Sequence, residues 1–534
     1  MLQENLLLIL LLLFVVSMII MLGKKLRISY PIFLVLAGLV LSFVPGVPDF
    51  KISPDWIFMV ILPPLLYQAA WGTCWNNFWK WKRSIVMLAF GLVLFTSCVV
   101  AYFSNAFIPG FTMALGLLLG AVISPPDAIA ASSVLQDLNA PKRTVTILEG
   151  ESLLNDAASL IVFRFALEAV ITGRFVKEEA AVAFFVVGFM GVIIGLSLAV
   201  LFFAIHRFFP AVPNMNAALE VIAPYFMYLI AEHYGFSGVM AVVSGGLFMS
   251  FSSMKLHNYA LSRLHSAAIG SVIVYILNGL VFILIGLQLP VVIASLHGYS
   301  LYDATKYAIV ISILTIIVRM IWLFFTSYVP GWLYSKFRTM QKKQKWQNAF
   351  VISWAGMRGV VSLASALSIP LFLDNGKVFP QRNLILFITF VVILVTLVFQ
   401  GLTLPWLLKF LKVEETDKLT ADKIQEADIN KRLLMIALAE LNEKYSRDVQ
   451  QNEMLSKYKT ELERDLKLHT QLGKSDLYTK EQIAGFVDVT NKILKNLRDE
   501  LILMRQDNSF DDEILRRRER QMDLDEVLIY HRKY

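Results

Sequence analysis

Oxygen-bearing side chains cluster in one stretch of an otherwise apolar sequence, residues 149–159. On a helix, Ser152 and Asp156 are one turn apart and share a face, and Glu151 and Asn155 share the neighbouring face. Carboxylate, amide and hydroxyl oxygens are the ligands that hard cations prefer. This stripe predicts a site for a dehydrated cation or a proton. The alternative is a polar contact between two helices.

A second stretch combines Pro125, Pro126 and Asp127 inside the apolar run 112–136. Prolines remove backbone donors and disfavour helix at the residue before them, so this helix is predicted to break next to Asp127. A break offers free carbonyl groups and a carboxylate to a cation, provided that it lines a cavity. The alternative is a structural kink in which Asp127 caps a half-helix.

Two arginines lie within apolar runs, where a charged group is costly and usually paired. Arg319 is expected to pair with a carboxylate such as Glu151. Arg358 lies in the interrupted stretch Gly356-Met357-Arg358-Gly359, where it would support a broken helix. For both arginines, structural salt bridging is the alternative to a role in an ion path.

The elements that carry these residues belong to a membrane part. Only 17% of the 534 residues are charged, whereas soluble domains have about 25%. The deficit lies in residues 1–411, with 15 acidic and 26 basic residues; residues 412–534 have 26 and 23. Continuous apolar runs of about 20 residues indicate helices rather than a β-barrel. The sequence predicts an all-α polytopic membrane protein, with a transmembrane domain at 1–411 and a helical cytoplasmic tail at 412–534. It excludes a single soluble domain, a disordered chain and a collagen-like chain.

Thirteen apolar segments alternate with loops of unequal charge. The loops predicted on one side contain 16 basic residues, including Lys80, Lys82 and Arg83, and those on the other side contain six. The positive-inside rule then places the N-terminus outside and the tail in the cytoplasm. The first segment has no basic region before it, so it is interpreted as a retained helix rather than a signal peptide. The segments are 4–22, 28–45, 54–71, 84–104, 112–136, 144–171, 180–205, 215–233, 237–252, 267–296, 303–330, 347–373 and 383–411, of which the eighth and ninth could form one broken unit.

Internal symmetry connects the two interrupted stretches. Transporters often contain inverted repeats whose interrupted helices meet at the binding site. If segments 1–6 repeat as 8–13, the fifth segment corresponds to the twelfth. The sequence therefore predicts inverted repeats with broken helices 5 and 12.

The tail is predicted to form helices over 424–472 and 483–504, separated at Gly473–Asp476. It is interpreted as a solvated extension, with a regulatory module as the alternative. The cluster Arg516–Arg518 alternates with acids and predicts a mixed-charge surface. The net charge of +8 comes from the loops of the membrane part, so nucleic acid is not a predicted partner.

The run Gly150-Glu151-Ser152-Leu153-Leu154-Asn155-Asp156 resembles a signature of the monovalent cation:proton antiporter-1 family, the Na⁺/H⁺ exchangers, in their NhaP-like bacterial type. The resemblance covers about residues 1–411 and leaves the tail outside. Further matches are Leu62-Pro63-Pro64-Leu65-Leu66, Asp127, Arg319 and Gly356-Met357-Arg358-Gly359.

The resemblance implies thirteen helices, a homodimer, and core and dimerisation domains that move against each other. It implies that Asp156 binds the cation and the proton, that Asp127, Asn155 and Ser152 assist, and that Glu151 pairs with Arg319. Na⁺ would lie at Asp156, Asp127 and Ser152. Members with Asn-Asp at this position are generally electroneutral, whereas those with Asp-Asp are usually electrogenic.

This sequence departs from the family pattern at two places. Family members often have Asp-Pro at the fifth-segment break, whereas here Pro125 and Pro126 precede Asp127. The break is therefore shifted, which calls into question backbone ligands such as the Pro126 carbonyl. Family members often place an acid shortly after Leu-Pro-Pro, and here Gln68 follows instead, which leaves one carboxylate fewer near the ion path.

The predicted function is secondary active antiport of Na⁺, or else Li⁺ or K⁺, for H⁺ across the plasma membrane. Asp156 binds either a proton or the cation and never both, so exchange needs no cofactor and no chemical step. The predicted partners are monovalent cations, protons and membrane lipids. A K⁺/H⁺ antiporter of the same family is the first alternative, and a cation channel is the alternative of another class. An enzyme is not favoured because no zinc-protease spacing or nucleophile motif occurs.

Overall fold

The structure is a computed structural model that divides into two compact units, Met1–Thr416 and Asp417–Tyr534. The two units are described separately. Their assignment to the membrane and to the cytoplasm stays a prediction. The structure describes residues 2–26, 29–44, 54–137, 140–173, 177–209, 213–253, 260–294, 296, 299–333, 346–373, 376–411, 422–472, 480–506 and 510–531.

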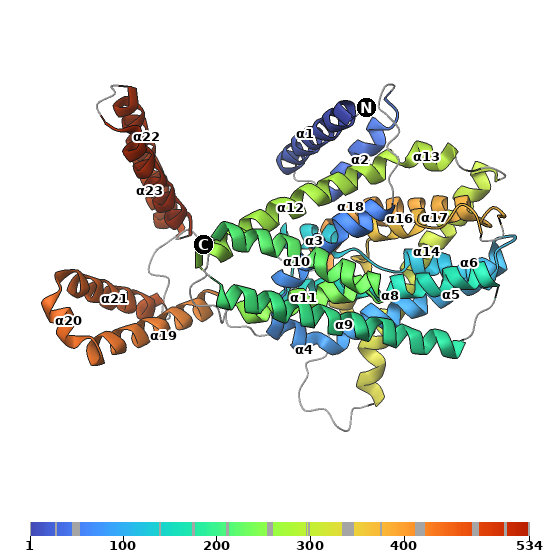
Figure 1. The fold of residues 1–534 in the computed structure, drawn as a ribbon, viewed down its shortest axis with the longest axis horizontal. Coiled ribbons are helices and arrows are strands. Elements are labelled where there is room, and N and C mark those ends of the chain that lie inside the picture. Colours follow the sequence, from blue (N-terminus) through green and yellow to red (C-terminus); the bar gives the residue numbers. More distant parts are fainter. Residues whose placement is uncertain are drawn as a thin grey trace. The chain divides into compact units, whose positions relative to one another are not determined.

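The first unit is built from helices (Figure 1). In its first half these are α1 (Leu2–Leu26), α2 (Tyr30–Leu41), the π-helical η1 (Trp56–Ile61), α3 (Leu62–Gly72), α4 (Trp75–Val86), the π-helical η2 (Met87–Leu92), α5 (Val93–Phe107), α6 (Met113–Ile123), α7 (Ala128–Asp137) and α8 (Lys142–Thr172). Then follow α9 (Lys177–Phe208), α10 (Pro213–His233), α11 (Gly238–Ser253), α12 (Ala260–Leu287), α13 (Leu289–Ala294), α14 (Leu301–Leu333), α15 (Trp346–Trp354), α16 (Val360–Leu367), α17 (Arg382–Leu394), the π-helical η3 (Val395–Gln400) and α18 (Gly401–Leu411). Within the described residues, the β-structure is limited to one bridge between Phe372 and Val378.

The all-α architecture predicted from the sequence is confirmed. Each predicted apolar segment coincides with one helix or with a run of consecutive helices. Six spans in the described part of the chain are long and apolar enough to cross a membrane, so the count of thirteen stays a prediction. The eighth and ninth segments form separate helices, α10 and α11, because the chain turns at Tyr234–Ser237, where Gly235 has a φ of +76°.

Both predicted helix breaks are confirmed. The fifth segment is interrupted between Ile123 and Ala128, where two prolines cannot donate backbone hydrogen bonds. The twelfth is interrupted between Trp354 and Val360. Gly359 is required there because a Cβ atom would overlap the Asp127 carboxylate. The interruptions thus lie at positions that correspond under the predicted offset of seven segments.

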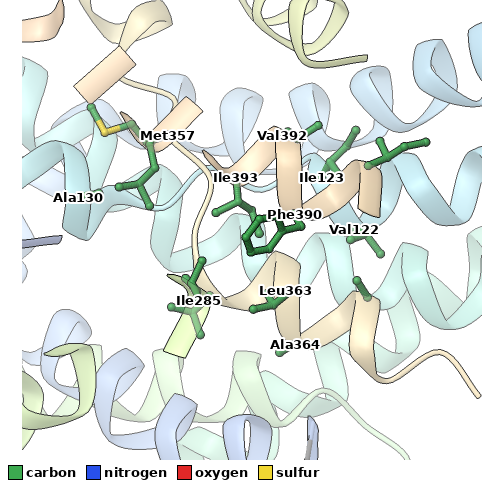
Figure 2. Close-up of a cluster of buried hydrophobic side chains, with 14 of the residues drawn as sticks. Val122, Ile123, Ala130, Ile285, Met357, Leu363, Ala364, Phe390, Val392 and Ile393 are labelled. Carbon is green, nitrogen blue, oxygen red and sulfur yellow. The ribbon is translucent and has the colours of Figure 1, made fainter. Parts of the chain in front are cut away.

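Apolar side chains surround the two interrupted helices (Figure 2). Val122 and Ile123 of α6, Leu363 of α16, and Phe390 and Ile393 of α17 are each at most 1% exposed. Tight packing of this kind fixes the positions of the helix ends, because displacing one side chain leaves a costly void. The core therefore holds the irregular backbone in one arrangement.

Several basic residues that were predicted to lie in loops lie on helices instead. Lys80, Lys82 and Arg83 were expected in a loop, but they lie on α4, which extends the fourth apolar segment at its start. The Lys82 ammonium lies 4.1 Å from the centre of the Trp79 ring. Tryptophan and lysine side chains combine apolar surface with a polar end. A helix rich in both can therefore continue from an apolar region into a polar one.

The second unit contains five helices within its described residues. They are α19 (Asp422–Glu443), α20 (Ser446–Gln451), α21 (Glu453–Leu472), α22 (Lys480–Gln506) and α23 (Asp512–His531). The helical pattern predicted over 424–472 is divided among three helices, with interruptions at Lys444–Tyr445 and at Asn452, whose side chain accepts a hydrogen bond from the Met454 backbone N–H at 2.9 Å before α21. The predicted break at Gly473–Asp476 lies outside the described residues.

The mixed-charge region near the end of the chain forms α23, which packs on α22. Arg498 of α22 forms ion pairs with Asp523, at 2.6 Å, and with Glu526, at 2.5 Å. Arg505 and Glu519 lie 3.7 Å apart. Alternating charges therefore join two helices of the tail.

We predict that Gly120→Ala destabilises the first unit by about 1–3 kcal/mol, the usual cost of overpacking. A Cβ at Gly120 would lie 2.7 Å from the Ser97 backbone of α5. In the matched control Gly188→Ala, the nearest atom is 3.7 Å away. The measurement is thermal unfolding in detergent. Equal melting temperatures for the two variants would show that the α5–α6 contact is not tight.

Candidate functional site

The two interrupted helices bind each other through their irregular backbone. The Asp127 backbone N–H donates to the Met357 carbonyl at 2.6 Å. In the other direction, Arg358 Nε donates to the Ile123 carbonyl at 3.1 Å. The Arg358 backbone N–H donates to Thr396 Oγ1 in η3, at 3.1 Å. Each break therefore supplies hydrogen-bond partners to the other.

Arginine side chains satisfy the carbonyl groups that the broken helices leave free. A helix leaves its last carbonyl groups without partners. A cation near them is also stabilised by the negative end of the helix dipole. Arg358 contacts the end of α6 at Ile123. Arg319 of α14 donates to the carbonyls of Ile352 and Ser353 at the end of α15, each at 3.2 Å.

Arg319 also forms a paired, two-point contact with Glu151 of α8. Its two terminal nitrogens lie 2.5 and 2.8 Å from the two carboxylate oxygens. The two side chains are 1% and 0% exposed. Such a bidentate pair neutralises both charges and joins α8, α14 and the end of α15.

Asp127 lies between the starting ends of two half-helices. One of its oxygens accepts the backbone N–H of Ile129 at 2.8 Å, which caps α7. Its carboxylate also lies against Gly359, immediately before α16. Ser152 Oγ lies 3.3 Å from the Ala128 backbone nitrogen, which donates to it. The positive ends of the helix dipoles favour a carboxylate here.

Asn155 positions the break of the fifth segment. Its side-chain nitrogen donates to the Pro126 carbonyl at 2.8 Å, and the residue is fully buried. The Pro126 carbonyl lies in the interruption of the helix, where it has no helical hydrogen-bond partner, and the Asn155 amide supplies one. Asn155 therefore connects α8 to the break instead of lining the cavity described next.

A cavity of about 410 Å³ lies between the break and α3, α8 and α12. Three acids line it, Asp127, Glu149 and Asp156, and no lysine, arginine or histidine is among its described lining residues. Asp156 is 8% exposed. Among the described residues, no side chain forms a hydrogen bond or ion pair with its carboxylate. The cavity therefore contains an acidic group that its protein surroundings leave uncompensated.

The structure divides the predicted site residues into two groups. Asp127, Ser152, Asp156 and Pro125 line the cavity. Those that hold the surrounding backbone and do not line it are Pro126, Glu151, Asn155, Arg319 and Arg358.

Sequence reasoning missed several polar residues of the cavity wall. They include Tyr30, Ser132, Asn278 and Ser362. Asn278 is 1% exposed, and its side-chain oxygen forms no hydrogen bond within the described residues. An amide inside the apolar run 267–296 was the available signal for Asn278. Tyr30 and the two serines had no distinguishing sequence signal, since such residues are common in membrane helices.

The family model described as sodium/hydrogen exchanger, transmembrane, matches residues 10–410. The chain belongs to this family. The match spans both broken helices and every residue of the site described above, so the candidate site lies inside the exchanger region. The tail lies outside it.

Individual relatives agree with this placement. A sodium, potassium, lithium and rubidium/H⁺ antiporter of Bacillus pumilus is 32% identical over 433 residues, which cover 79% of this chain and 63% of that protein. The chain thus spans less than two thirds of that relative. An uncharacterized Na⁺/H⁺ exchanger of Mycobacterium tuberculosis is 30% identical over 95% of this chain and 93% of its own length.

The fold is that of a solved antiporter structure. The sodium proton antiporter MjNhaP1 of Methanocaldococcus jannaschii superposes with a TM-score of 0.63 and 18% identity, over 78% of this chain and all of that one. At this identity the likeness concerns the fold alone.

We predict that Glu151→Met and Arg319→Met each destabilise the protein by about 3–5 kcal/mol, because each leaves a buried charge without its partner. The double variant should lose less than the two single losses together, since it removes both charges. Thermal unfolding in detergent measures this cycle. As a control, Arg164→Met breaks a pair whose side chains are 46% and 25% exposed, which should cost only about 0–1 kcal/mol. Additive losses in the cycle would contradict a coupled pair.

Proposed function

We propose that this exchanger is a secondary active antiporter that exchanges Na⁺ for H⁺ across the plasma membrane. Cation and proton compete for Asp156, and alternating access carries either one between the two sides. The homodimer, the outside N-terminus and the cytoplasmic tail belong to the same proposal.

The uncompensated carboxylate of Asp156 carries the proposal. It lines an acidic cavity together with Asp127 and Ser152, and no basic residue is among the described residues of that lining. A carboxylate at membrane depth is costly unless a counter-charge neutralises it. Either a proton or a dehydrated alkali cation supplies that charge, and one carboxylate accommodates one of them at a time. Obligatory exchange follows from this competition.

Electroneutral exchange is proposed because the charged groups near Asp156 already have partners in the protein. Glu151 is neutralised by Arg319, and Asp127 is engaged as the cap of α7. Position 155 carries a neutral amide whose nitrogen binds the Pro126 carbonyl. With Asp156 as the carboxylate that exchanges its occupant, one Na⁺ moves in one direction and one H⁺ in the other.

The position of the cavity supports access from the cytoplasm. Gln68 and Gly72 lie near the end of α3, and Glu149 lies near the start of α8, the ends that loop charges predict to be cytoplasmic. Towards the opposite ends of their helices, Arg164 of α8 and Glu232 of α10 form an ion pair. Opening to the other side would require this contact to separate.

We predict that Asp156→Asn abolishes Na⁺-dependent proton movement, because an amide at this position cannot exchange a proton for a cation. Everted membrane vesicles with a pH-sensitive dye measure it, at matched amounts of exchanger. The control is Asp303→Asn, which changes an exposed acid in the first turn of α14. Retained exchange in the Asp156 variant would refute the assignment of this carboxylate.

We predict exchange with Na⁺ and Li⁺ and no net charge movement. Purified exchanger in liposomes, tested with Na⁺, Li⁺, K⁺ and Rb⁺ against choline, gives the cation preference. The relative named for transport of all four cations makes K⁺/H⁺ exchange the second candidate. Solid-supported membrane recordings measure charge: a sustained current coupled to exchange would contradict electroneutrality, and a current without proton coupling would indicate a channel.

A further inference from the structure

A second, smaller cavity lies beside the one that contains Asp156. It measures about 30 Å³ and lies between α3, α10 and α12, which pack on one another (Figure 1). Its polar lining residues are Tyr67 and Gln68 of α3, Glu220 of α10 and Ser266 of α12. One water molecule needs about 10–15 Å³ of such space, so the cavity accommodates a guest of that size.

Within the described residues, the acid of this second cavity has no basic residue beside it in the lining, and the tyrosine hydroxyl has no hydrogen-bond partner. No basic residue is among its described lining residues, although Glu220 lies within a predicted membrane helix. Tyr67 is 4% exposed, and its hydroxyl forms no hydrogen bond in the described part of the chain. The Ser266 hydroxyl, which lines the same cavity as Glu220, is also buried without a hydrogen-bond partner in the described part of the chain. Buried polar groups without partners are rare in native structures and call for a ligand or a function.

The chemistry of these groups suits an alkali cation. A carboxylate, a phenol, a hydroxyl and an amide present oxygen atoms around a space of atomic size. Hard monovalent cations prefer such ligands, and a carboxylate at this depth gains most from a positive guest.

Gln68 connects the two cavities. Its side chain lines both the cavity that contains Asp156 and the cavity that contains Glu220. Gly270 of α12 makes room for it, since a Cβ there would lie 2.6 Å from Gln68 Oε1. The Gln68 amide is therefore a common wall between the two spaces.

A row of polar contacts leads from the start of α10 and α12 to Glu220. His265 Nδ1 and Asn214 Oδ1 lie 3.1 Å apart. Asn216 donates to Ser262 at 3.1 Å. Glu220 lies one helical turn beyond Asn216, and Ser266 lies one turn beyond Ser262, so these two residues continue the helix faces of the buried Asn216–Ser262 contact. By the loop charges, the row begins at the cytoplasmic end.

We propose that Glu220, with Tyr67 and Ser266, forms a second binding site for the transported monovalent cation. The site holds the cation near the cytoplasmic end before the cation passes Gln68 and reaches Asp156. This inference rests on the proposed antiport, and it assigns Glu220 to cation capture and not to the obligatory exchange at Asp156.

The transport test is Glu220→Gln, which keeps the shape of the side chain and removes its charge. The apparent KM for Na⁺ should rise about tenfold, equivalent to about 1.4 kcal/mol, with the maximal exchange rate kept within about twofold. Tyr67→Phe and Ser266→Ala should each raise the KM less. The control Glu168→Gln, an exposed acid on α8, should leave the KM unchanged. Proteoliposomes with a pH dye measure all of these.

A binding test separates this site from Asp156. In purified Asp156→Asn protein, NaCl should still raise the melting temperature relative to choline chloride, because the Glu220 site remains. Adding Glu220→Gln should remove that difference. This readout needs no transport, so it holds or fails independently of whether Asp156 is the exchanging carboxylate.

A third experiment moves the carboxylate from position 220 to position 68. Gln68→Glu in the Glu220→Gln background returns a carboxylate to the same cavity and should restore most of the wild-type KM. An unchanged KM in folded Glu220→Gln protein would overturn the proposal. Complete loss of exchange in that variant would overturn it as well, because Glu220 would then be indispensable.

Discussion

The organisation of the site depends on one constraint: backbone groups of broken helices need partners where water is scarce. Two helices are interrupted at the same place, so four half-helix ends require hydrogen bonds there. Arg358 and Arg319 bond the carbonyls at the ends of α6 and α15, and Asp127 caps α7. The Asp127 backbone N–H donates to the Met357 carbonyl and so joins the two interruptions, which together form the crossing of the broken helices.

This constraint also determines which charges are available for function. A cation at each helix end needs an anion nearby, and Glu151 supplies it for Arg319. Asp127 is already engaged as a cap, and Arg358 is bound to carbonyl groups. Once the structural requirements are met, Asp156 is the acid in the cavity whose carboxylate has neither a hydrogen bond nor an ion pair within the described residues. The features that stabilise the crossing and the feature proposed to carry ions are therefore complementary.

Much of this arrangement could be predicted from residue types, and the limits have physical reasons. Pro125 and Pro126 cannot sustain a helix, so the first break was predictable, and the spacing of Ser152 and Asp156 predicted their common face. The partner of Arg358 was not predictable, because backbone carbonyls do not differ from one residue to the next in a sequence. The cap at Asn452 was equally hidden, since asparagine also occurs within helices.

Two carboxylates on one helix show how position separates structure from function. Glu151 and Asp156 are five residues apart on α8, which rotates them by about 140° around the axis at 3.6 residues per turn. Glu151 therefore faces the side where Arg319 and α15 lie, whereas Asp156 faces the cavity. The same acidic chemistry is neutralised by an arginine on one face, and on the other it is left for the cation or proton of the proposed exchange. A helix that carries both groups can keep its own position while the occupant of Asp156 changes, because Glu151 anchors it through a pair that no transported ion needs to displace.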